Sequence, residues 1–130
     1  MADDNWLLDT SILIDLLHGR QNARAWIDSL DVEVRYISVV TAAELLAGCA
    51  NKREEQKLAR ELNLYHIAWI DEVMSERALN LYRALRLSHG VGFLDCLIAA
   101  TALEKNFVVA TLNLKHFKPI AGLQVKRPYQ

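Results

Sequence analysis

The chain has 130 residues, and 52% of them are hydrophobic, so it is long enough to bury a core and too apolar to be a disordered tail. Lysine and arginine total 15 against 16 aspartates and glutamates, which excludes nucleic-acid binding by overall charge alone. Any nucleic-acid partner must therefore be held by a local basic patch or through a metal ion. We expect a single domain over residues 1–130.

Apolar periodicity predicts strands that alternate with helices. In chain order we expect a strand at 5–9, helices at 11–18 and 22–30, a strand at 33–38, helices at 41–48 and 51–63, a strand at 65–69, a helix from Asp71 to Ser88, a helix at 93–106, and strands at 107–111 and 123–127. This alternation indicates an α/β fold around a mostly parallel sheet. The continuously apolar segments WLL and FVVA suit strands that are covered on both faces.

The cysteines and the N-terminal segment bear on the compartment. Cys49 and Cys96 lie in apolar stretches at a spacing that suits neither a zinc site nor a disulfide scaffold, so both are expected to be buried hydrophobic side chains. The start, MADDNWLLD, lacks a signal-peptide pattern, and no apolar run reaches the ~20 residues that span a bilayer. We expect a soluble cytoplasmic protein with no membrane partner.

Several oxygen-bearing side chains fall at one edge of the predicted sheet, beyond the carboxyl ends of its strands, where open parallel sheets bind ligands. Asp9 ends the first strand, Glu44 lies near the start of the helix after the second, and Asp95 opens the buried helix. Thr111 and Asn113 follow the next strand. Carboxylates brought together repel unless a cation joins them, and an all-oxygen ligand set favours Mg²⁺ or Mn²⁺. The sequence therefore predicts a metal site that can activate water against a phosphodiester.

Each of these acidic residues also has a purely structural explanation. Asp9 can be the N-cap of the helix at 11–18, and Asp95 can be a helix-start residue favoured by the helix dipole. Thr41 and Glu44 match a T-x-x-E capping box, which by itself explains Glu44. The common position of the three carboxylates on one edge is what favours a functional site.

Four segments in order resemble the successive motifs of PIN-domain proteins, most closely those of VapC-type toxins from prokaryotic toxin–antitoxin pairs. They are LLDTSILIDLL, TAAELLAG, GFLDCLIAATAL and VVATLNLKHF, and together they run through nearly the whole chain. The resemblance implies a three-layer α/β/α domain with a five-stranded parallel sheet. It also implies a metal-dependent endoribonuclease that leaves a 5′-phosphate and a 3′-hydroxyl, with tRNA as the leading substrate, a cognate antitoxin as partner, and a homodimer.

The resemblance also assigns roles residue by residue. Asp9, Glu44 and Asp95 match the three metal carboxylates, with Glu44 ligating Mg²⁺ or Mn²⁺ directly or through water. Glu44 or Asp95 is then expected to take the proton of the attacking water. Thr10 and Ser11 match the small hydroxyl residues after the first aspartate and are expected to contact substrate.

The fourth motif departs from the fullest family pattern. Many relatives have an aspartate where this chain has Asn113, so the site has one negative charge fewer, and we expect Asn113 to act in catalysis through its carbonyl or a bound water. Thr111 and His116 flank it as candidate substrate contacts. Arg86 and His89 are the expected phosphate contacts outside the metal site, so that RNA binding should weaken as salt rises.

Other functions remain open at this point. A catalytically silent PIN-like module that binds RNA or protein is the main alternative, and the presence of all three carboxylates argues against it. Receiver domains and haloacid-dehalogenase phosphatases are disfavoured because Asp9 is followed by Thr10 and Ser11 rather than by their second acid. Trp26 and Trp69 have rings that can stack on bases, but their apolar neighbours favour packing in the core or at a dimer interface.

Overall fold

A wholly parallel sheet lies at the centre of residues 4–130, the part of the chain that the computed structural model describes. Its five strands are ordered β3-β2-β1-β4-β5, and every neighbouring pair runs parallel. The strands are β1 (Trp6–Leu8), β2 (Arg35–Ser38), β3 (His66–Ala68), β4 (Val108–Ala110) and β5 (Val125–Lys126). The predicted α/β class is confirmed.

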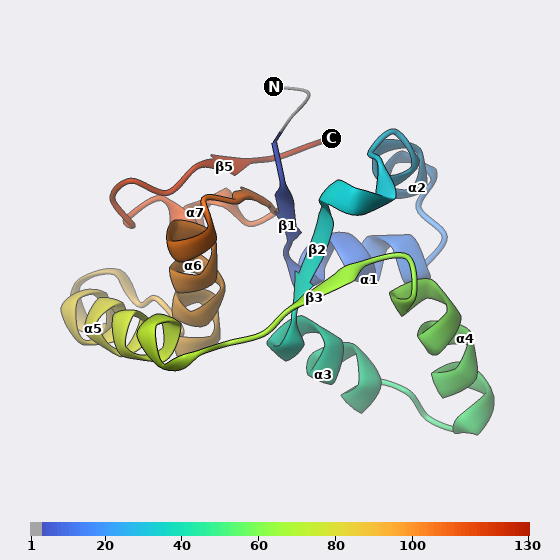
Figure 1. Ribbon diagram of the computed structural model, residues 1–130, viewed down its shortest axis with the longest axis horizontal. Coiled ribbons are helices and arrows are strands. Elements are labelled where there is room, and N and C mark those ends of the chain that lie inside the picture. Colours follow the sequence, from blue (N-terminus) through green and yellow to red (C-terminus); the bar gives the residue numbers. More distant parts are fainter. Residues whose placement is uncertain (1–3) are drawn as a thin grey trace.

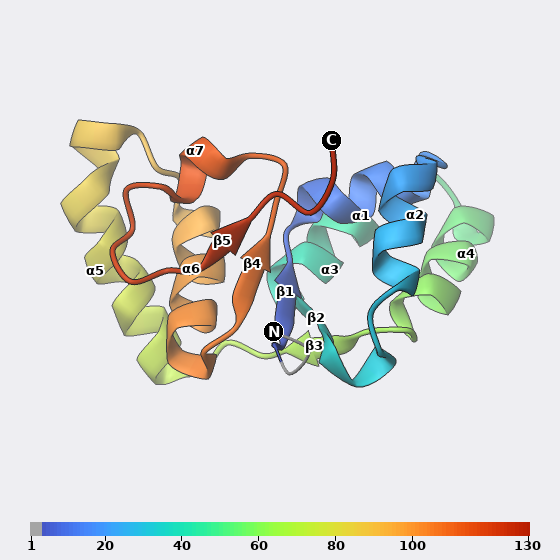
Figure 2. The same ribbon diagram turned by 90° about the horizontal axis from the view of Figure 1, so that it is seen from above.

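Helices cover both faces of this sheet and make three layers. They are α1 (Thr10–Leu17), α2 (Gln21–Asp28), α3 (Val39–Ala47), α4 (Lys52–Leu62), α5 (Glu72–His89), α6 (Phe93–Lys105) and α7 (Leu114–Phe117). Figures 1 and 2 show α1 to α4 on one side of the strands and α5 to α7 on the other. Within residues 4–130, no helix is long and apolar enough to cross a bilayer.

Side-chain alternation along the central strands supplies the two cores. Leu7 packs with Val109 and with Ile98 of α6, whereas Leu8 packs with Ala110 on the face covered by α1. Full burial of a leucine contributes roughly 1.5–3 kcal/mol. Because neighbouring residues of β1 face opposite layers, the strand register fixes which side of the sheet each helix must cover. The chain leaves β1 at the carboxyl edge of the sheet.

Helix α6 is the helix most enclosed by its surroundings, as its apolar sequence predicts. Residues 96–102 of α6 are all buried, between the sheet and α5. The predicted N-cap of α5 is also present, since the carboxylate of Asp71 accepts a hydrogen bond from the backbone N–H of Met74 at 2.9 Å. Met74 and Ala78 then pack on the buried side of α5.

Four local expectations are wrong, the last of them in part. The segment predicted as the start of the second strand forms a 3₁₀ turn at Val32–Val34, and helix α7 is not predicted at all. Helix α3 begins at Val39 rather than at residue 41, because the Ser38 hydroxyl at the end of β2 accepts from the N–H of Val40 at 3.1 Å and starts the helix earlier. Trp69 is 69% exposed, so it is not a core residue.

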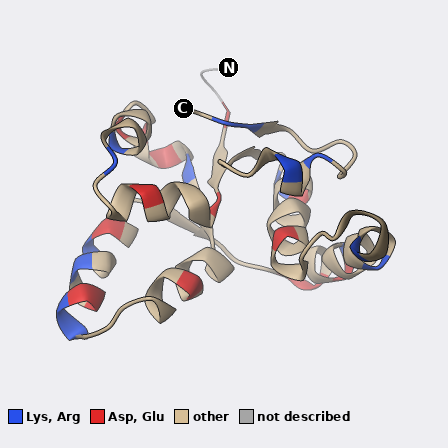
Figure 3. Ribbon diagram, turned by 180° about the vertical axis from the view of Figure 1, so that it is seen from behind, with Lys and Arg blue, Asp and Glu red and all other residues tan. Residues whose placement is uncertain are grey.

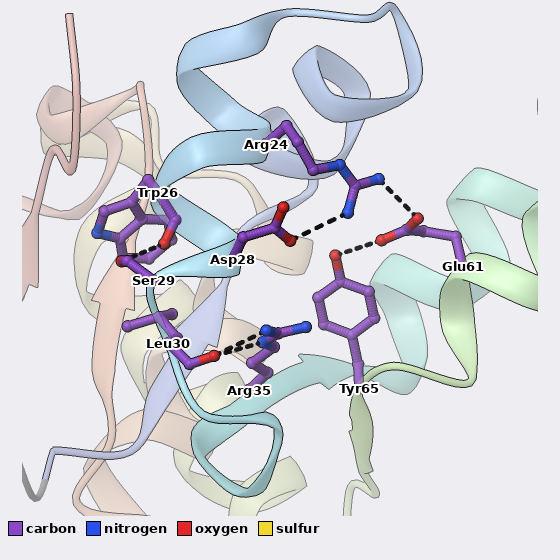
Figure 4. A network of polar contacts seen from close by, with 8 residues as sticks. All are labelled: Arg24, Trp26, Asp28, Ser29, Leu30, Arg35, Glu61 and Tyr65. Carbon is purple, nitrogen blue, oxygen red and sulfur yellow. Dashed lines mark hydrogen bonds and ion pairs between the residues drawn. The ribbon is translucent and has the colours of Figure 1, made fainter.

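A polar network joins α2, α4 and the start of β3 (Figure 4). The Tyr65 hydroxyl donates to one carboxylate oxygen of Glu61 at 2.8 Å, and the other oxygen accepts from Arg24 at 2.9 Å. Arg35, buried on β2, donates twice to the carbonyl of Leu30 and holds the turn that precedes β2. Tyr65 is itself buried in the core that contains Leu8 and Ala110, so this network fixes α4 beside that core.

We expect Tyr65→Phe to lower the free energy of unfolding by about 1–3 kcal/mol, because the Glu61 carboxylate loses a donor in a partly buried setting. Urea denaturation measures the change. Tyr36→Phe is the matched control, since the Tyr36 hydroxyl makes no hydrogen bond within residues 4–130 and the substitution keeps the ring that packs against Phe107 and His66. Equal losses in both variants would contradict this role.

The same pair predicts a loss of stability in alkali. Burial, followed by the hydrogen bond to Glu61, raises the pKa of Tyr65 above its usual range, so the unfolded chain ionises first. The stabilising contribution is therefore present below about pH 10 and lost as the pH rises further. Unfolding free energy should fall less steeply above this pH in Tyr65→Phe than in the unaltered protein.

Candidate active site

The Asp9 side chain is held by two hydroxyl groups. Asp9 follows β1 and occupies the N-cap position of α1, but its side chain makes no capping hydrogen bond. Its Oδ2 accepts instead from Ser11 Oγ at 3.0 Å and from Thr111 Oγ1 at 2.8 Å. The residue is only 6% exposed. Helix capping therefore does not account for the Asp9 carboxylate.

Glu44 lies on α3 and faces α1, the neighbouring helix on the same side of the sheet. It lies in the second turn of α3, and its Oε1 accepts from the hydroxyl of Thr10 at 2.8 Å. The hydroxyls of Thr10 and the fully buried Thr41 are 3.0 Å apart. The capping-box alternative is wrong, because α3 is already formed at Thr41 and the Glu44 carboxylate points to a neighbouring helix.

Asp95 completes the group from the other side of the sheet. It lies in the first turn of α6, and its Oδ2 is 3.3 Å from Nδ1 of His116. Burial raises the pKa of the Asp95 carboxyl, the charge of Asp9 raises it further, His116 lowers it and Glu44 raises it. The charges of Asp9 and Glu44, which come from separate elements, thus both reach Asp95 at the carboxyl edge of the sheet.

The remaining predicted site residues fall into two groups. Asn113 is exposed, and its backbone N–H donates at 3.0 Å to Thr111 Oγ1, the hydroxyl that donates to Asp9. Arg86 and His89 lie in the last turn of α5, at the same end of the molecule as the carboxyl ends of the strands but on the outer flank (Figure 2). His89 pairs with the neighbouring Ser88 at 2.7 Å, and neither Arg86 nor His89 contacts a carboxylate of the site.

The pairing of His116 with Asp95 is not anticipated from the sequence. It depends on α7, a single turn whose Leu114 and Phe117 share one face before Pro119 ends it. That i, i+3 apolar pair before a proline is the signal that could have predicted the turn. Figure 3 marks lysine or arginine positions on α7 and at the end of β5, which is an edge strand of the sheet.

The donor set suits a hard divalent cation, although the side chains are not gathered around one point. Within residues 4–130, no three His, Cys, Asp or Glu side chains form a ready cluster for a metal ion. The raised pKa of Asp95 has like-charge repulsion from Asp9 among its causes, and a cation would relieve that repulsion. Oxygen-only donors fit Mg²⁺ or Mn²⁺.

The fold and this acidic edge define a three-layer α/β protein whose site lies beyond the carboxyl ends of its central strands. Comparison with known families narrows the class further. A profile of the PIN domain matches residues 6–123. The chain belongs to the PIN-domain family.

Similar proteins extend over nearly the whole chain. Ribonuclease VapC10 of Mycobacterium tuberculosis is 37% identical over 125 residues, covering 95% of this chain and 92% of that protein. Ribonuclease VapC1 of Methanocaldococcus jannaschii is 34% identical and covers 92% and 84%. A toxin–antitoxin complex from Klebsiella pneumoniae contains a chain with a TM-score of 0.80 and 31% identity, covering 97% of this chain and 99% of that one.

We expect Asp95→Asn to stabilise the metal-free protein by about 0.5–1 kcal/mol at pH 7, because it removes a carboxylate that is costly in the folded state. The raised pKa means that the folded chain takes up its proton before the unfolded chain does, so the cost shrinks as the pH falls toward about 4. Thermal unfolding with a chelator measures the gain. Asp31→Asn, at an exposed position, is the control, and a gain that grows on acidification would contradict the assignment.

Proposed function

We propose that this protein is a metal-dependent endoribonuclease and the toxin of a VapBC-type toxin–antitoxin pair. The observation that carries the proposal is the placement of Asp9, Glu44 and Asp95, from three separate elements, at the carboxyl edge of the sheet, where the charges of Asp9 and Glu44 both reach the Asp95 carboxyl. Support comes from the relatives, which are named ribonucleases, and from the similar structure, a toxin–antitoxin complex.

In this proposal Asp9, Glu44 and Asp95 hold one Mg²⁺ or Mn²⁺. The bound cation supplies charge stabilisation for the scissile phosphate and orientation for the attacking water. Glu44 is the most exposed of the three carboxylates and is suited to take a proton from that water. Asn113, which is exposed, contributes its side-chain carbonyl to the same water or to the substrate.

Cationic side chains around the edge bind the RNA backbone in this scheme. Lys115 and Lys118 flank His116 on the exposed side of α7, and Arg86 and His89 lie at the end of α5. Thr10 lines the groove beside Glu44 and is proposed to contact the substrate. Phosphate contacts of this kind release counterions, so binding weakens as salt rises. We propose tRNA as the leading substrate, with cleavage leaving a 5′-phosphate and a 3′-hydroxyl.

We expect the purified protein to cut total RNA at discrete positions with Mg²⁺ or Mn²⁺ and to stop when a chelator is added. Asp9→Asn should reduce the rate at least 100-fold while circular dichroism shows an intact fold, because the loss of a ligand charge removes the bound cation. Asp31→Asn is the control, an exposed acid remote from the edge. Activity that persists in Asp9→Asn would refute the site.

The alternative, a catalytically silent module, predicts a different pattern in the same assay. It predicts salt-sensitive RNA binding without cleavage at any cation concentration, and no effect of Asp9→Asn on that binding. Sequencing of the RNA ends identifies the target and the chemistry of the products. Sedimentation of the purified protein tests the further proposal that it is a homodimer.

An apolar groove beside the site is the proposed binding surface for the antitoxin. Its volume is about 580 Å³, and its lining includes Ile14 and Leu17 of α1 and Leu58 of α4 together with Thr10 and Glu44. Ile14 and Leu17 are 42% and 38% exposed, so α1 presents large apolar side chains to solvent where it lines the groove. A helix or extended segment of the antitoxin seated here would lie directly over Glu44 and block access to it.

We expect Leu17→Asp to reduce co-purification with the cognate antitoxin at least tenfold, because a charge would be buried in the apolar interface. Leu79→Asp is the matched control, since Leu79 is also exposed but lies on α5, across the sheet. Affinity capture from cells that express both genes measures the effect. Equal loss in the two variants would place the antitoxin elsewhere.

A further inference from the structure

The three carboxylates share a pattern that family membership does not explain. In each, one oxygen is engaged by another side chain, namely Asp9 Oδ2 by Ser11 and Thr111, Glu44 Oε1 by Thr10, and Asp95 Oδ2 by His116. No hydrogen bond between described residues reaches the second oxygen of any of the three. Each carboxylate is therefore divided into one engaged and one unengaged oxygen.

The unengaged oxygens remain accessible. Within residues 4–130, no buried side-chain nitrogen or oxygen lacks a hydrogen-bond partner. Asp9 is only 6% exposed, and its Oδ1 has no hydrogen-bond partner among these residues. Since none of the buried polar atoms described lacks a partner, Asp9 Oδ1 is in contact with solvent at the surface of the site. Oδ2 of Asp9 is thus the oxygen that accepts from the two hydroxyls, and Oδ1 is the accessible oxygen that remains for a ligand.

The hydroxyls that hold Asp9 cannot easily turn away. Ser11 Oγ accepts from the backbone N–H of Leu112 at 3.2 Å, and Thr111 Oγ1 accepts from that of Asn113 at 3.0 Å. Each hydroxyl thus already accepts a backbone N–H, and its single proton is directed at Asp9 Oδ2, which is closer to each of them than the 3.5 Å that separates Ser11 Oγ from Thr111 Oγ1. Two donors aimed at one oxygen hold the carboxylate plane, and they also join it to the loop that follows β4.

We propose that Ser11, Thr111, Thr10 and His116 are positioning residues that make each carboxylate a one-oxygen ligand, and that this arrangement favours Mg²⁺ and Mn²⁺ over Ca²⁺. The inference rests on the proposed function. Ca²⁺ takes six to eight oxygens and commonly binds both oxygens of a carboxylate, whereas Mg²⁺ takes six in a tight octahedron with one from each ligand. Hydrogen bonds to one oxygen compete with metal binding at that oxygen, most strongly at Asp9 Oδ2, which accepts two, so they disfavour the two-oxygen mode relative to the one that suits the smaller ion.

The test compares cation affinities, which need no RNA and no turnover. Isothermal titration with Mg²⁺, Mn²⁺ and Ca²⁺ is carried out on the full chain and on Ser11→Ala, Thr111→Val and their combination. We expect each single variant to bind Mg²⁺ about tenfold more weakly, as for other residues that orient metal ligands. The ratio of the Ca²⁺ to the Mg²⁺ dissociation constant should fall about tenfold in the double variant, because Asp9 becomes free to offer both oxygens.

Thr101→Val is the matched control. Thr101 is as fully buried as Thr111, but its hydroxyl donates to the carbonyl of Leu97 within α6, away from the carboxylates. Thr111→Ser keeps the hydroxyl and should restore both the Mg²⁺ affinity and the ratio. If Thr111→Val folds poorly, Ser11→Ala, at a half-buried position, gives the same comparison.

The role of His116 is tested with two substitutions that each keep a nitrogen near one of the two ring-nitrogen positions. Its Nδ1 faces Asp95, and an asparagine side chain places its amide nitrogen near that position, whereas glutamine places it near Nε2. His116→Asn should keep Mg²⁺ affinity within about threefold of the original, and His116→Gln should lose about tenfold. Amide exchange in the metal-free protein adds an independent readout, since Leu112 should exchange faster in Ser11→Ala and Asn113 faster in Thr111→Val.

The outcomes separate this inference from the proposed function. If the unaltered protein binds no divalent cation, both are overturned. If it binds a cation and cuts RNA, but Thr111→Val matches Thr101→Val in affinity and in the Ca²⁺ to Mg²⁺ ratio, only the positioning role is overturned. A ratio that falls in Thr111→Val and recovers in Thr111→Ser supports it.

Discussion

The hydrogen bonds that Asp9 accepts from Ser11 and Thr111 are the interactions on which the rest of the site depends. The bond from Thr111 joins the end of β1 to the end of β4, its neighbour in the sheet, and both bonds hold a carboxylate beside strongly apolar segments where an unpaired charge would be costly. The parallel sheet makes this possible because both strands end at the same edge. Without that common edge, the hydroxyl of Thr111 could not reach an aspartate near the other end of the chain.

The two helical layers bring the other carboxylates to this edge from opposite sides. Helix α3 presents Glu44 from the first layer, and α6 presents Asp95 from the second. The large apolar area buried by α6 offsets the cost of keeping Asp95 half-buried near two like charges. The repulsion at Asp95 is thus located where a bound cation would remove it. The stability of the surrounding core compensates for this repulsion in the metal-free protein.

The sequence predicts the order and type of nearly all elements, because strands covered on both faces and helices with one apolar face leave clear patterns. It also brings Asp9, Glu44 and Asp95 to one edge, since topology alone decides which strand ends meet. It does not predict the early start of α3, because the T-x-x-E pattern at Thr41 competes locally with the Ser38 cap. Nor does it predict the contact of His116 with Asp95, which depends on a one-turn helix too short for periodicity to detect. Side-chain partners across long separations are set by packing, which a single sequence does not display.

The separation of 102 residues between Asp9 and Thr111 has a consequence during synthesis. Strand β1 leaves the ribosome early, but its neighbour β4 and the second hydroxyl that fixes Asp9 are translated near the end of the chain. Partial chains can form α1 to α4, yet they lack the strand that closes the centre of the sheet. A nascent or truncated chain that ends before β4 therefore has no completed site, and any nuclease activity appears only after β4 and Thr111 have been translated.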